Sequence, residues 1–237
     1  MRTFIIHLTR ATARRTHVEK LSGSAPYPAE VVEAVDGKAH GPTDRLKAKL
    51  YPPRYPFTLT PGEIGAFLSH RACWSRIVDQ SLDYALILED DVALDDGFAD
   101  AVAFAAQHIA NLGYVQFQTR PINGPYKAVQ RDGDAAICRP QVVPVRLSAQ
   151  LVSRHAAEKL LAMTETFDRP VDTFLQMRWE TGQEIYVAQP SSVSDVAGNI
   201  GGSTISVRRS VLAKIPREIK RAIYRTRINA ISRKDGR

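Results

Sequence analysis

The chain of 237 residues contains little of what marks several protein classes. Its only cysteines are Cys73 and Cys138, too few for a disulfide framework. No apolar run approaches the roughly 20 residues that cross a bilayer. The first apolar run is short and is followed at once by arginines, unlike a secretory signal. With 44% hydrophobic and 24% charged residues, the composition excludes rods and disordered polymers. We therefore expect a globular protein of the cytoplasm.

Positive charge is concentrated at the C-terminal end. The formal net charge is +7, but residues 208–237 hold 11 basic and 2 acidic side chains. Residues 1–207 hold 21 basic and 23 acidic side chains and are nearly neutral. The sequence therefore predicts a folded domain over 1–207 followed by a basic tail over 208–237.

The basic tail has the pattern of an amphipathic helix. After Pro216, the side chains of Ile219, Ala222 and Ile223 share one helical face, with basic residues around it. Such a helix can lie on an anionic inner-leaflet membrane surface, or it can be a solvated extension. The tail has few aromatic residues, which argues against nucleic acid as its partner.

Apolar runs alternate with amphipathic segments along much of the chain. This alternation predicts an α/β fold with a mostly parallel sheet flanked by helices in a single domain. Residues 38–61 are rich in proline and basic residues and predict a long surface loop, and 119–146 predict short strands and turns. The apolar runs that predict strands are 3–8, 30–35, 84–88, 114–118 and 184–188. The segments that predict helices are 11–21, 96–109, 153–163 and one from 172 to Gly182, besides the helix that follows Thr60.

The helix after Thr60 has the clearest start. Thr60, Pro61 and Glu63 match a capping box with proline at its first position. An apolar arc follows along the helix. Arg71 falls inside this arc, which usually requires an anionic partner, and His70 lies at its edge.

Three carboxylates follow the apolar run Tyr84–Leu88. In extended geometry Glu89 and Asp91 point to one side and Asp90 to the other. Two carboxylates on one side repel each other unless a cation intervenes, and Mg²⁺ or Mn²⁺ accepts such ligands together with phosphate oxygens. The cluster predicts a metal site at a strand end. A solvated strand end or a helix cap is the alternative.

The run GEIGAFLSHRACWSRIVDQSLDYALILEDDV, Gly62–Val92, closely resembles the signature of glycosyltransferase family 25. That family includes lipooligosaccharide and collagen galactosyltransferases. Weaker likenesses extend the resemblance to about residues 3–205. They are FIIHLTRATARR, Val35-Asp36-Gly37, Leu151–Arg154 with Ala157–Leu160, Pro170-Val171-Asp172 and Ser203-Thr204-Ile205.

The resemblance implies a GT-A-like (Rossmann-like) fold and an inverting hexosyltransferase. The implied donor is a nucleotide-sugar, with UDP-galactose as the first choice and UDP-glucose as an alternative. The implied acceptor is a surface oligosaccharide or a glycolipid, as in lipopolysaccharide biosynthesis. Glu89 and Asp91 would hold Mn²⁺ or Mg²⁺, and Asp90 completes the acidic motif.

The resemblance also suggests roles for other residues, each with a simpler alternative. Arg14 and Arg15 can contact donor phosphates or belong to a solvated helix face. Asp36 can bind ribose or base, or only make a turn. His70, and with it Arg71, can contact the donor, although a single histidine at an apolar edge is commonly a core residue.

Asp172 is the candidate base that takes the proton of the acceptor hydroxyl, and its alternative role is to cap a helix. The sequence departs from the family pattern at three places. His7 replaces a typical asparagine, 146–150 lack a glycine and an aromatic residue, and 190–195 lack a glutamine. A metal-dependent phosphohydrolase and a non-enzymatic nucleic-acid binder are the alternative functions. No second acidic cluster of similar quality supports the former.

Overall fold

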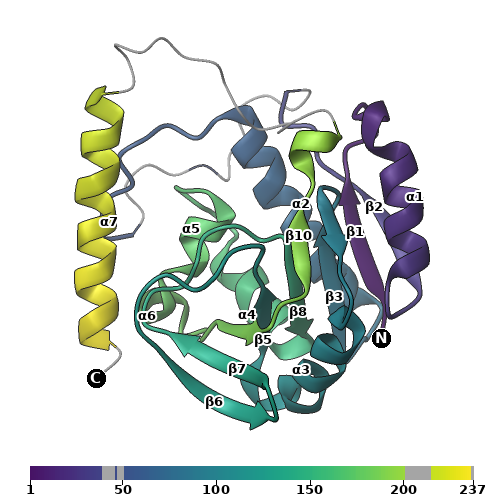
Figure 1. Ribbon diagram of the computed structural model, residues 1–237. Coiled ribbons are helices and arrows are strands. Elements are labelled where there is room, and N and C mark those ends of the chain that lie inside the picture. The colour runs from purple at the N-terminus through teal and green to yellow at the C-terminus, as the bar shows by residue number, and fades with distance from the viewer. Residues whose placement is uncertain (39–45, 47–50, 201–214, 236–237) are drawn as a thin grey trace.

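The computed structural model describes residues 1–38, 46, 51–200 and 215–235, and an eight-stranded sheet forms its centre (Figure 1). The strand order is β2-β1-β3-β8-β5-β9-β7-β6. The strands are β1 (Thr3–His7), β2 (Ala29–Glu33), β3 (Tyr84–Glu89), β5 (Tyr114–Phe117), β6 (Tyr126–Asp132), β7 (Ala135–Pro140), β8 (Ala149–Ser153) and β9 (Tyr186–Gln189). The helices are α1 (Arg15–Ser24), α2 (Pro61–Asp79), α3 (Phe98–Leu112), α4 (Arg154–Met163), α5 (Val171–Leu175), α6 (Arg178–Thr181) and α7 (Ile215–Asp235).

Most strands of the sheet run in one direction. The pairings place β2, β1, β3, β5, β9 and β6 parallel in direction, whereas β8 and β7 are reversed. The sheet is therefore mixed in its hydrogen bonding but mostly parallel in strand direction. This confirms the predicted α/β class with helices flanking a mostly parallel sheet.

The sheet is covered on both faces because alternate side chains of its central strands are apolar. On one face, Phe4 and Ile87 pack with α2 and α4 around the fully buried Trp74. On the other face, Ile5 and Leu88 pack with α1 and α3. Burial on both faces explains why β3 is a continuous apolar run rather than an alternating one. Its polar end, Glu89, lies at the edge of this core.

Several predicted boundaries are confirmed and others are wrong. The capping box forms: the Thr60 Oγ1 accepts the Glu63 N–H at 3.3 Å, and Glu63 accepts the Thr60 N–H at 2.7 Å. The helix predicted over 11–21 begins only at Arg15, after a 3-10 turn, η1 (Thr12–Arg14). The single helix predicted from 172 to Gly182 is two short helices, because the chain leaves helical geometry at Met177.

A short antiparallel pair was not predicted from the sequence. β4 (Val92–Leu94) pairs with β10 (Val193–Asp195), which a short 3-10 helix, η2 (Ala197–Asn199), follows. The pair brings residues 193–195 beside the acidic cluster. Strands of three residues carry too little periodicity for detection from sequence.

The C-terminal helix α7 packs along the domain on the side of α5 and α6, away from α1 (Figure 1). Among its described side chains, Tyr224, Ile228 and Ser232 are buried, whereas Ile219 and Ile223 are exposed. The predicted helix is therefore present, and the predicted apolar face around Ile219 and Ile223 is exposed. Among the described residues, no helix is long and apolar enough to cross a membrane. Residues 39–45 and 47–50 of the predicted 38–61 loop, the Ser203-Thr204-Ile205 motif, and residues 208–214 and 236–237 of the tail lie outside the described residues.

Candidate functional site

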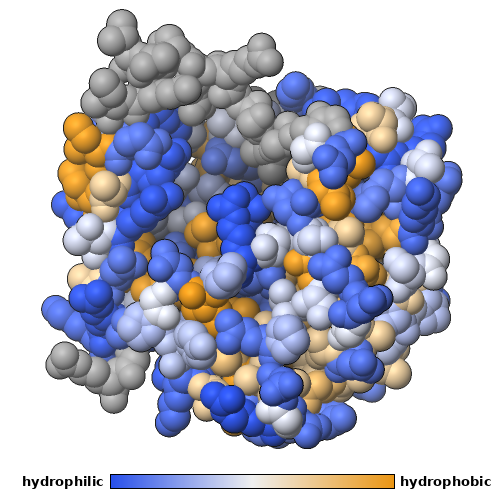
Figure 2. Space-filling view, viewed as in Figure 1, coloured by the Kyte–Doolittle hydropathy of each residue, from blue (hydrophilic) through white to orange (hydrophobic). Residues whose placement is uncertain are grey.

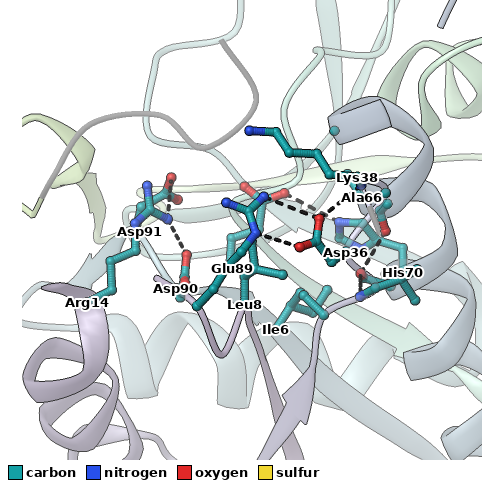
Figure 3. A pocket seen from close by; sticks show the side chains of 17 residues that line it. Ile6, Leu8, Arg14, Asp36, Lys38, Ala66, His70, Glu89, Asp90 and Asp91 are labelled. Carbon is teal, nitrogen blue, oxygen red and sulfur yellow. Dashed lines mark hydrogen bonds and ion pairs between the residues drawn. The ribbon is translucent and has the colours of Figure 1, made fainter. Parts of the chain in front are cut away.

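A cavity of about 100 Å³ lies where β1, β2 and β3 end. In open α/β sheets, ligands bind beyond the carboxyl ends of the strands, and this cavity has that position. Its walls are the segment after β1, the segment after β2, the first half of α2 and the acidic cluster (Figure 3). The residues after β1 and β2 include Leu8, Arg10, Arg14, Asp36 and Lys38.

Two glycines allow α2 to approach the segment after β2. A Cβ atom on Gly37 would lie 1.7 Å from the Pro61 carbonyl oxygen. A Cβ atom on Gly65 would lie 2.4 Å from the Val35 carbonyl oxygen. Two glycines facing each other thus bring the backbone of residues 35–38 against α2, which closes one wall of the cavity.

Glu89 ends β3, and its side chain remains about one-third exposed at the cavity. The Nε2 atom of buried His70 lies 3.4 Å from its Oε1 atom. On the other side of this imidazole, the Gln150 amide nitrogen lies 3.4 Å from Nδ1, and Tyr114 donates its hydroxyl hydrogen to the same Gln150 side chain. With Gln150 donating to Nδ1, the Nε2–H of His70 points to Glu89 and orients that carboxylate.

Asp90 faces the interior and is held there by two side chains. The buried His7 approaches its Oδ2 atom at 2.7 Å through Nδ1, and the buried Arg14 donates to its Oδ1 atom. Asp90 is itself 7% exposed. Its oxygens therefore hold Arg14 in the cavity wall. The sequence predicted that the side chain of Asp90 points away from those of Glu89 and Asp91, and the inward direction of Asp90 matches that prediction.

Asp91 follows in the turn after β3 and keeps about a quarter of its side chain exposed. The Arg14 Nη1 atom lies 3.4 Å from its Oδ2 atom. Burial first, and then the negative charge of Glu89, raise the pKa of Asp91 to about 6. The charge of Arg14 opposes this shift but does not cancel it.

Glu89 and Asp91 fit a divalent cation of the Mg²⁺ or Mn²⁺ type. Both are partly exposed oxygen ligands at the cavity, and their negative charges lie close enough to repel each other. The described residues contain no group of three or more histidine, cysteine, aspartate or glutamate side chains arranged for a metal ion. Mg²⁺ commonly takes one or two carboxylates and completes its shell with water and substrate phosphates. The pair suits a metal that arrives with a phosphorylated ligand.

Asp36 lies across the cavity from the acidic cluster (Figure 3). Its partner is Arg10, which was not among the site residues predicted from the sequence. Arg10 donates its Nε–H to the Asp36 Oδ2 at 2.6 Å, and the Lys38 N–H donates to Oδ1 at 2.9 Å. These contacts lower the pKa of Asp36. Arg10 and Asp36 also line a neighbouring hollow of about 630 Å³, so the pair lies where the two spaces meet.

Two predicted donor-binding residues lie away from the cavity lining. Arg15 is exposed at the start of α1, because the 3-10 turn directs Arg14 inward and leaves Arg15 outside. Arg71 points to the end of α4, where its Nη1 atom donates to the Leu161 carbonyl at 2.9 Å and to the Thr164 hydroxyl. Both acceptors lie near the C-terminal end of α4, where a positive charge is favourable.

Asp172 lies at the first turn of α5, and Pro170 rather than Asp172 is the N-cap residue. Its carboxylate accepts the N–H of Thr173 at 2.6 Å and the N–H of Arg146 at 3.1 Å. Burial raises the pKa of Asp172, these hydrogen bonds oppose the shift, and the charge of Glu89 adds to it. Asp172 is therefore close enough to Glu89 to interact with it electrostatically.

Arg146 connects Asp172 to the acidic cluster. Its backbone has a φ of 83°, and its guanidinium Nη1 donates to Asp195 Oδ2 at 2.7 Å. Asp195 ends β10, and the following N–H, of Val196, donates to the Asp91 carbonyl at 2.9 Å. No sequence pattern indicated this link, because it depends on the three-residue pairing of β4 with β10.

Comparison with known proteins identifies relatives of this chain. The sequence profile "Glycosyltransferase family 25 (LPS biosynthesis protein)" matches residues 1–131. Human "Procollagen galactosyltransferase 2" is 39% identical over 102 residues, which is 40% of this chain and 16% of that protein. A "Glycosyltransferase 25 family member" of Drosophila melanogaster is 30% identical over 195 residues, 76% of this chain and 31% of that protein. The chain thus spans less than a third of either relative.

Other matches qualify the likeness to active enzymes. Relatives from mouse, rat and cattle are named inactive or probable inactive members of the family. Among solved structures, a glycosyltransferase involved in the glycosylation of the major capsid of PBCV-1 aligns with 69% of this chain and 64% of that chain, at 12% identity and a TM-score of 0.38. Because the family profile covers more than half of the residues, the chain belongs to glycosyltransferase family 25.

Proposed function

We propose that the protein is an active, inverting glycosyltransferase that moves a hexose from a UDP-sugar to a glycan acceptor with the help of a divalent cation. The observation that carries this proposal is the pair of accessible carboxylates, Glu89 and Asp91, at the strand-end cavity with Arg14 beside them. Galactose is the proposed sugar because a matched relative is named a procollagen galactosyltransferase. A surface oligosaccharide or a glycolipid is the proposed acceptor.

The donor would bind with its diphosphate at the acidic cluster and its nucleoside toward Asp36. When bound, Mn²⁺ or Mg²⁺ supplies charge neutralisation for the departing diphosphate. Arg14, anchored on Asp90, adds a fixed positive charge beside the same phosphates. The carboxylate of Asp36 can accept hydrogen bonds from ribose hydroxyls once Arg10 shifts or shares it.

Asp172 is the proposed base. In an inverting transfer the acceptor oxygen attacks the anomeric carbon, the carbon–oxygen bond to the diphosphate breaks, and UDP leaves with the electron pair. The acceptor hydroxyl proton passes to Asp172, whose burial makes it a stronger base than an exposed aspartate. The N–H groups of Arg146 and Thr173 hold its two oxygens in place.

Nucleotide release tests the metal-dependent transfer. The protein is incubated with a panel of UDP-sugars and Mn²⁺, and the release of UDP is measured with and without chelator. We expect release with UDP-galactose that falls at least about 100-fold in Glu89→Ala and Asp91→Ala, because each change removes a ligand that orients the reacting diphosphate. The matched control is Asp132→Ala, an exposed carboxylate on β6.

Absence of metal-dependent turnover and of donor binding with every sugar contradicts the proposal and places the chain with the inactive members. Release of inorganic phosphate instead of UDP would indicate the phosphohydrolase alternative. Asp172→Asn is expected to keep donor binding, measured by calorimetry, while transfer to the acceptor is lost. Transfer at nearly the full rate in this variant would leave Asp172 as a purely structural residue.

A further inference from the structure

The outward face of α7 is apolar in its middle. Ile219 and Ile223 are 57% and 50% exposed, which is unusual for such large aliphatic side chains. Exposed small residues continue the same face along the helix, within an arc of about 100° at the helical repeat. We call this face the outer strip, and it consists of Ile219, Ala222, Ile223, Thr226 and Ala230. Figure 2 shows apolar surface over the upper part of α7.

Positive charge borders the outer strip on both sides. The exposed basic residues of α7 that belong to no ion pair within the described part of the chain are Lys220, Arg225, Arg227, Arg233 and Lys234. The two acidic residues of the helix are already paired, Glu218 with Arg221 and Asp235 with Arg178. The face turned to solvent therefore carries uncompensated positive charge around an aliphatic centre.

The opposite face of α7 fixes this orientation. Tyr224 and Ile228 are buried against the domain, and the Tyr224 hydroxyl accepts a hydrogen bond from the fully buried Arg169 at 2.9 Å. At the other end, Arg178 donates to the Ser232 carbonyl at 2.9 Å and to the Asp235 carboxylate at 2.7 Å. Because both ends are held, the outer strip stays turned away from the domain.

We propose that the outer strip and its flanking cations bind the surface of an anionic phospholipid bilayer, with α7 lying parallel to that surface. Aliphatic side chains enter the boundary between headgroups and acyl chains, and lysine and arginine hold the headgroup phosphates. A single-stranded nucleic acid fits this surface less well, because bases stack on exposed aromatic rings and the single aromatic residue of α7, Tyr224, is buried.

This attachment would place the reaction beside a membrane. Arg169, which anchors α7, directly precedes the Pro170-Val171-Asp172 turn that holds the proposed base. A glycolipid acceptor in the same bilayer would then reach the Asp172 side of the site from the membrane. This functional consequence rests on the proposed sugar transfer, whereas the membrane contact itself does not.

Vesicle co-sedimentation of the full chain tests the contact. Vesicles of phosphatidylcholine alone are compared with vesicles that also contain phosphatidylglycerol. We expect binding to the anionic vesicles only, and weaker binding as salt shortens the range of the charges. In Lys220→Gln/Arg227→Gln the partition coefficient should fall roughly 25-fold, about fivefold per charge. In Ile219→Ser/Ile223→Ser it should fall at least about tenfold, because the apolar insertion is lost.

Matched controls alter the same residue types elsewhere on the surface. Lys127→Gln/Arg131→Gln on β6, and Val145→Ser, should bind vesicles as the unchanged protein does. Three outcomes would each overturn the proposal. The protein could bind neutral and anionic vesicles equally, or the outer-strip variants could bind as the controls do. It could also bind an RNA homopolymer more tightly than it binds vesicles. All variants should melt at the same temperature, since the altered side chains are exposed.

Release of UDP without vesicles separates this inference from the proposed function. The outer-strip variants should release UDP at the unaltered rate, because none of the changed residues lines the cavity. If the unaltered protein releases no UDP but still sediments with anionic vesicles, the sugar transfer fails and the membrane contact stands. If it releases UDP but binds no vesicles, the sugar transfer stands and the membrane contact fails.

Discussion

At the scale of single residues, three adjacent carboxylates have different environments. Asp90 is held by His7 and Arg14 and serves the structure of the site. Glu89 and Asp91 stay accessible, and His70 orients the first of them. Their separation follows from the end of β3 at Glu89, after which a turn directs Asp90 inward.

The raised pKa of Asp91 predicts how the stability of the metal-free protein, measured in the presence of chelator, depends on pH. An unfolded aspartate ionises near pH 4, whereas burial and Glu89 hold the folded pKa at about 6. The folded state therefore binds more protons between these values, and its stability falls as the pH rises through them. Asp91→Asn removes this cost and should increase the free energy of unfolding at neutral pH by roughly 1–3 kcal/mol.

Urea unfolding at neutral pH and near pH 4 measures this effect. The gain of Asp91→Asn should disappear near pH 4, where the unaltered carboxyl is protonated in the folded protein. Asp132→Asn, an exposed carboxylate, is the control and should change stability little at either pH. A gain that is equal at both pH values would show that Asp91 ionisation costs the folded protein nothing.

At the scale of elements, the contact between α2 and the segment after β2 shapes the cavity. Gly65 lies inside a helix, where alanine usually stabilises by up to about 1 kcal/mol. Here the new Cβ atom would lie 2.4 Å from the Val35 carbonyl oxygen, a backbone atom that cannot rotate away. We expect Gly65→Ala to destabilise the protein by about 2 kcal/mol or more and to weaken donor binding, because residues 35–38 must move.

Gly23→Ala in α1 is the matched control for this prediction. A Cβ atom at Gly23 meets nothing within 4 Å, so the usual helical gain of up to about 1 kcal/mol should be realised. Thermal unfolding and donor titration of both variants provide the measurement. If the two substitutions have the same sign, the close approach of α2 does not constrain the cavity.

At the scale of the whole molecule, α7 is joined to the domain by two arginines on separate segments. Arg169 is fully buried between Asp168, the Tyr51 carbonyl and Tyr224. Arg178 reaches the last turn of α7, where a positive charge also suits the helix C-terminus. The helix is thus a structural part of the domain as well as its most basic segment.

Tyr224→Phe tests this junction. The change keeps the ring but removes the oxygen that accepts from Arg169, and leaves a buried N–H without that partner. We expect a loss of about 1–3 kcal/mol in the free energy of unfolding by urea. Tyr126→Phe, at a residue that is 50% exposed, should change it by less than about 0.5 kcal/mol. Equal stability of the two variants would contradict docking through Arg169.

The sequence by itself determined the features that local pattern encodes. The apolar run before Glu89 determined a central strand with an acidic end, and Thr60 with Glu63 determined where α2 begins. The motif over Gly62–Val92 determined the family, since its residues are contiguous in the chain. Each of these features depends on residues that are close together in the sequence, so the local sequence pattern is enough to specify it.

Only the tertiary structure decided which side chains meet. It paired Arg10 with Asp36, directed Arg71 to the end of α4, and linked Arg146 to Asp195. It also determined which face of α7 packs on the domain, which the sequence did not indicate. The reason is physical: Tyr224 and Ser232 are buried because distant arginines satisfy their oxygens, and such partners have no local signature.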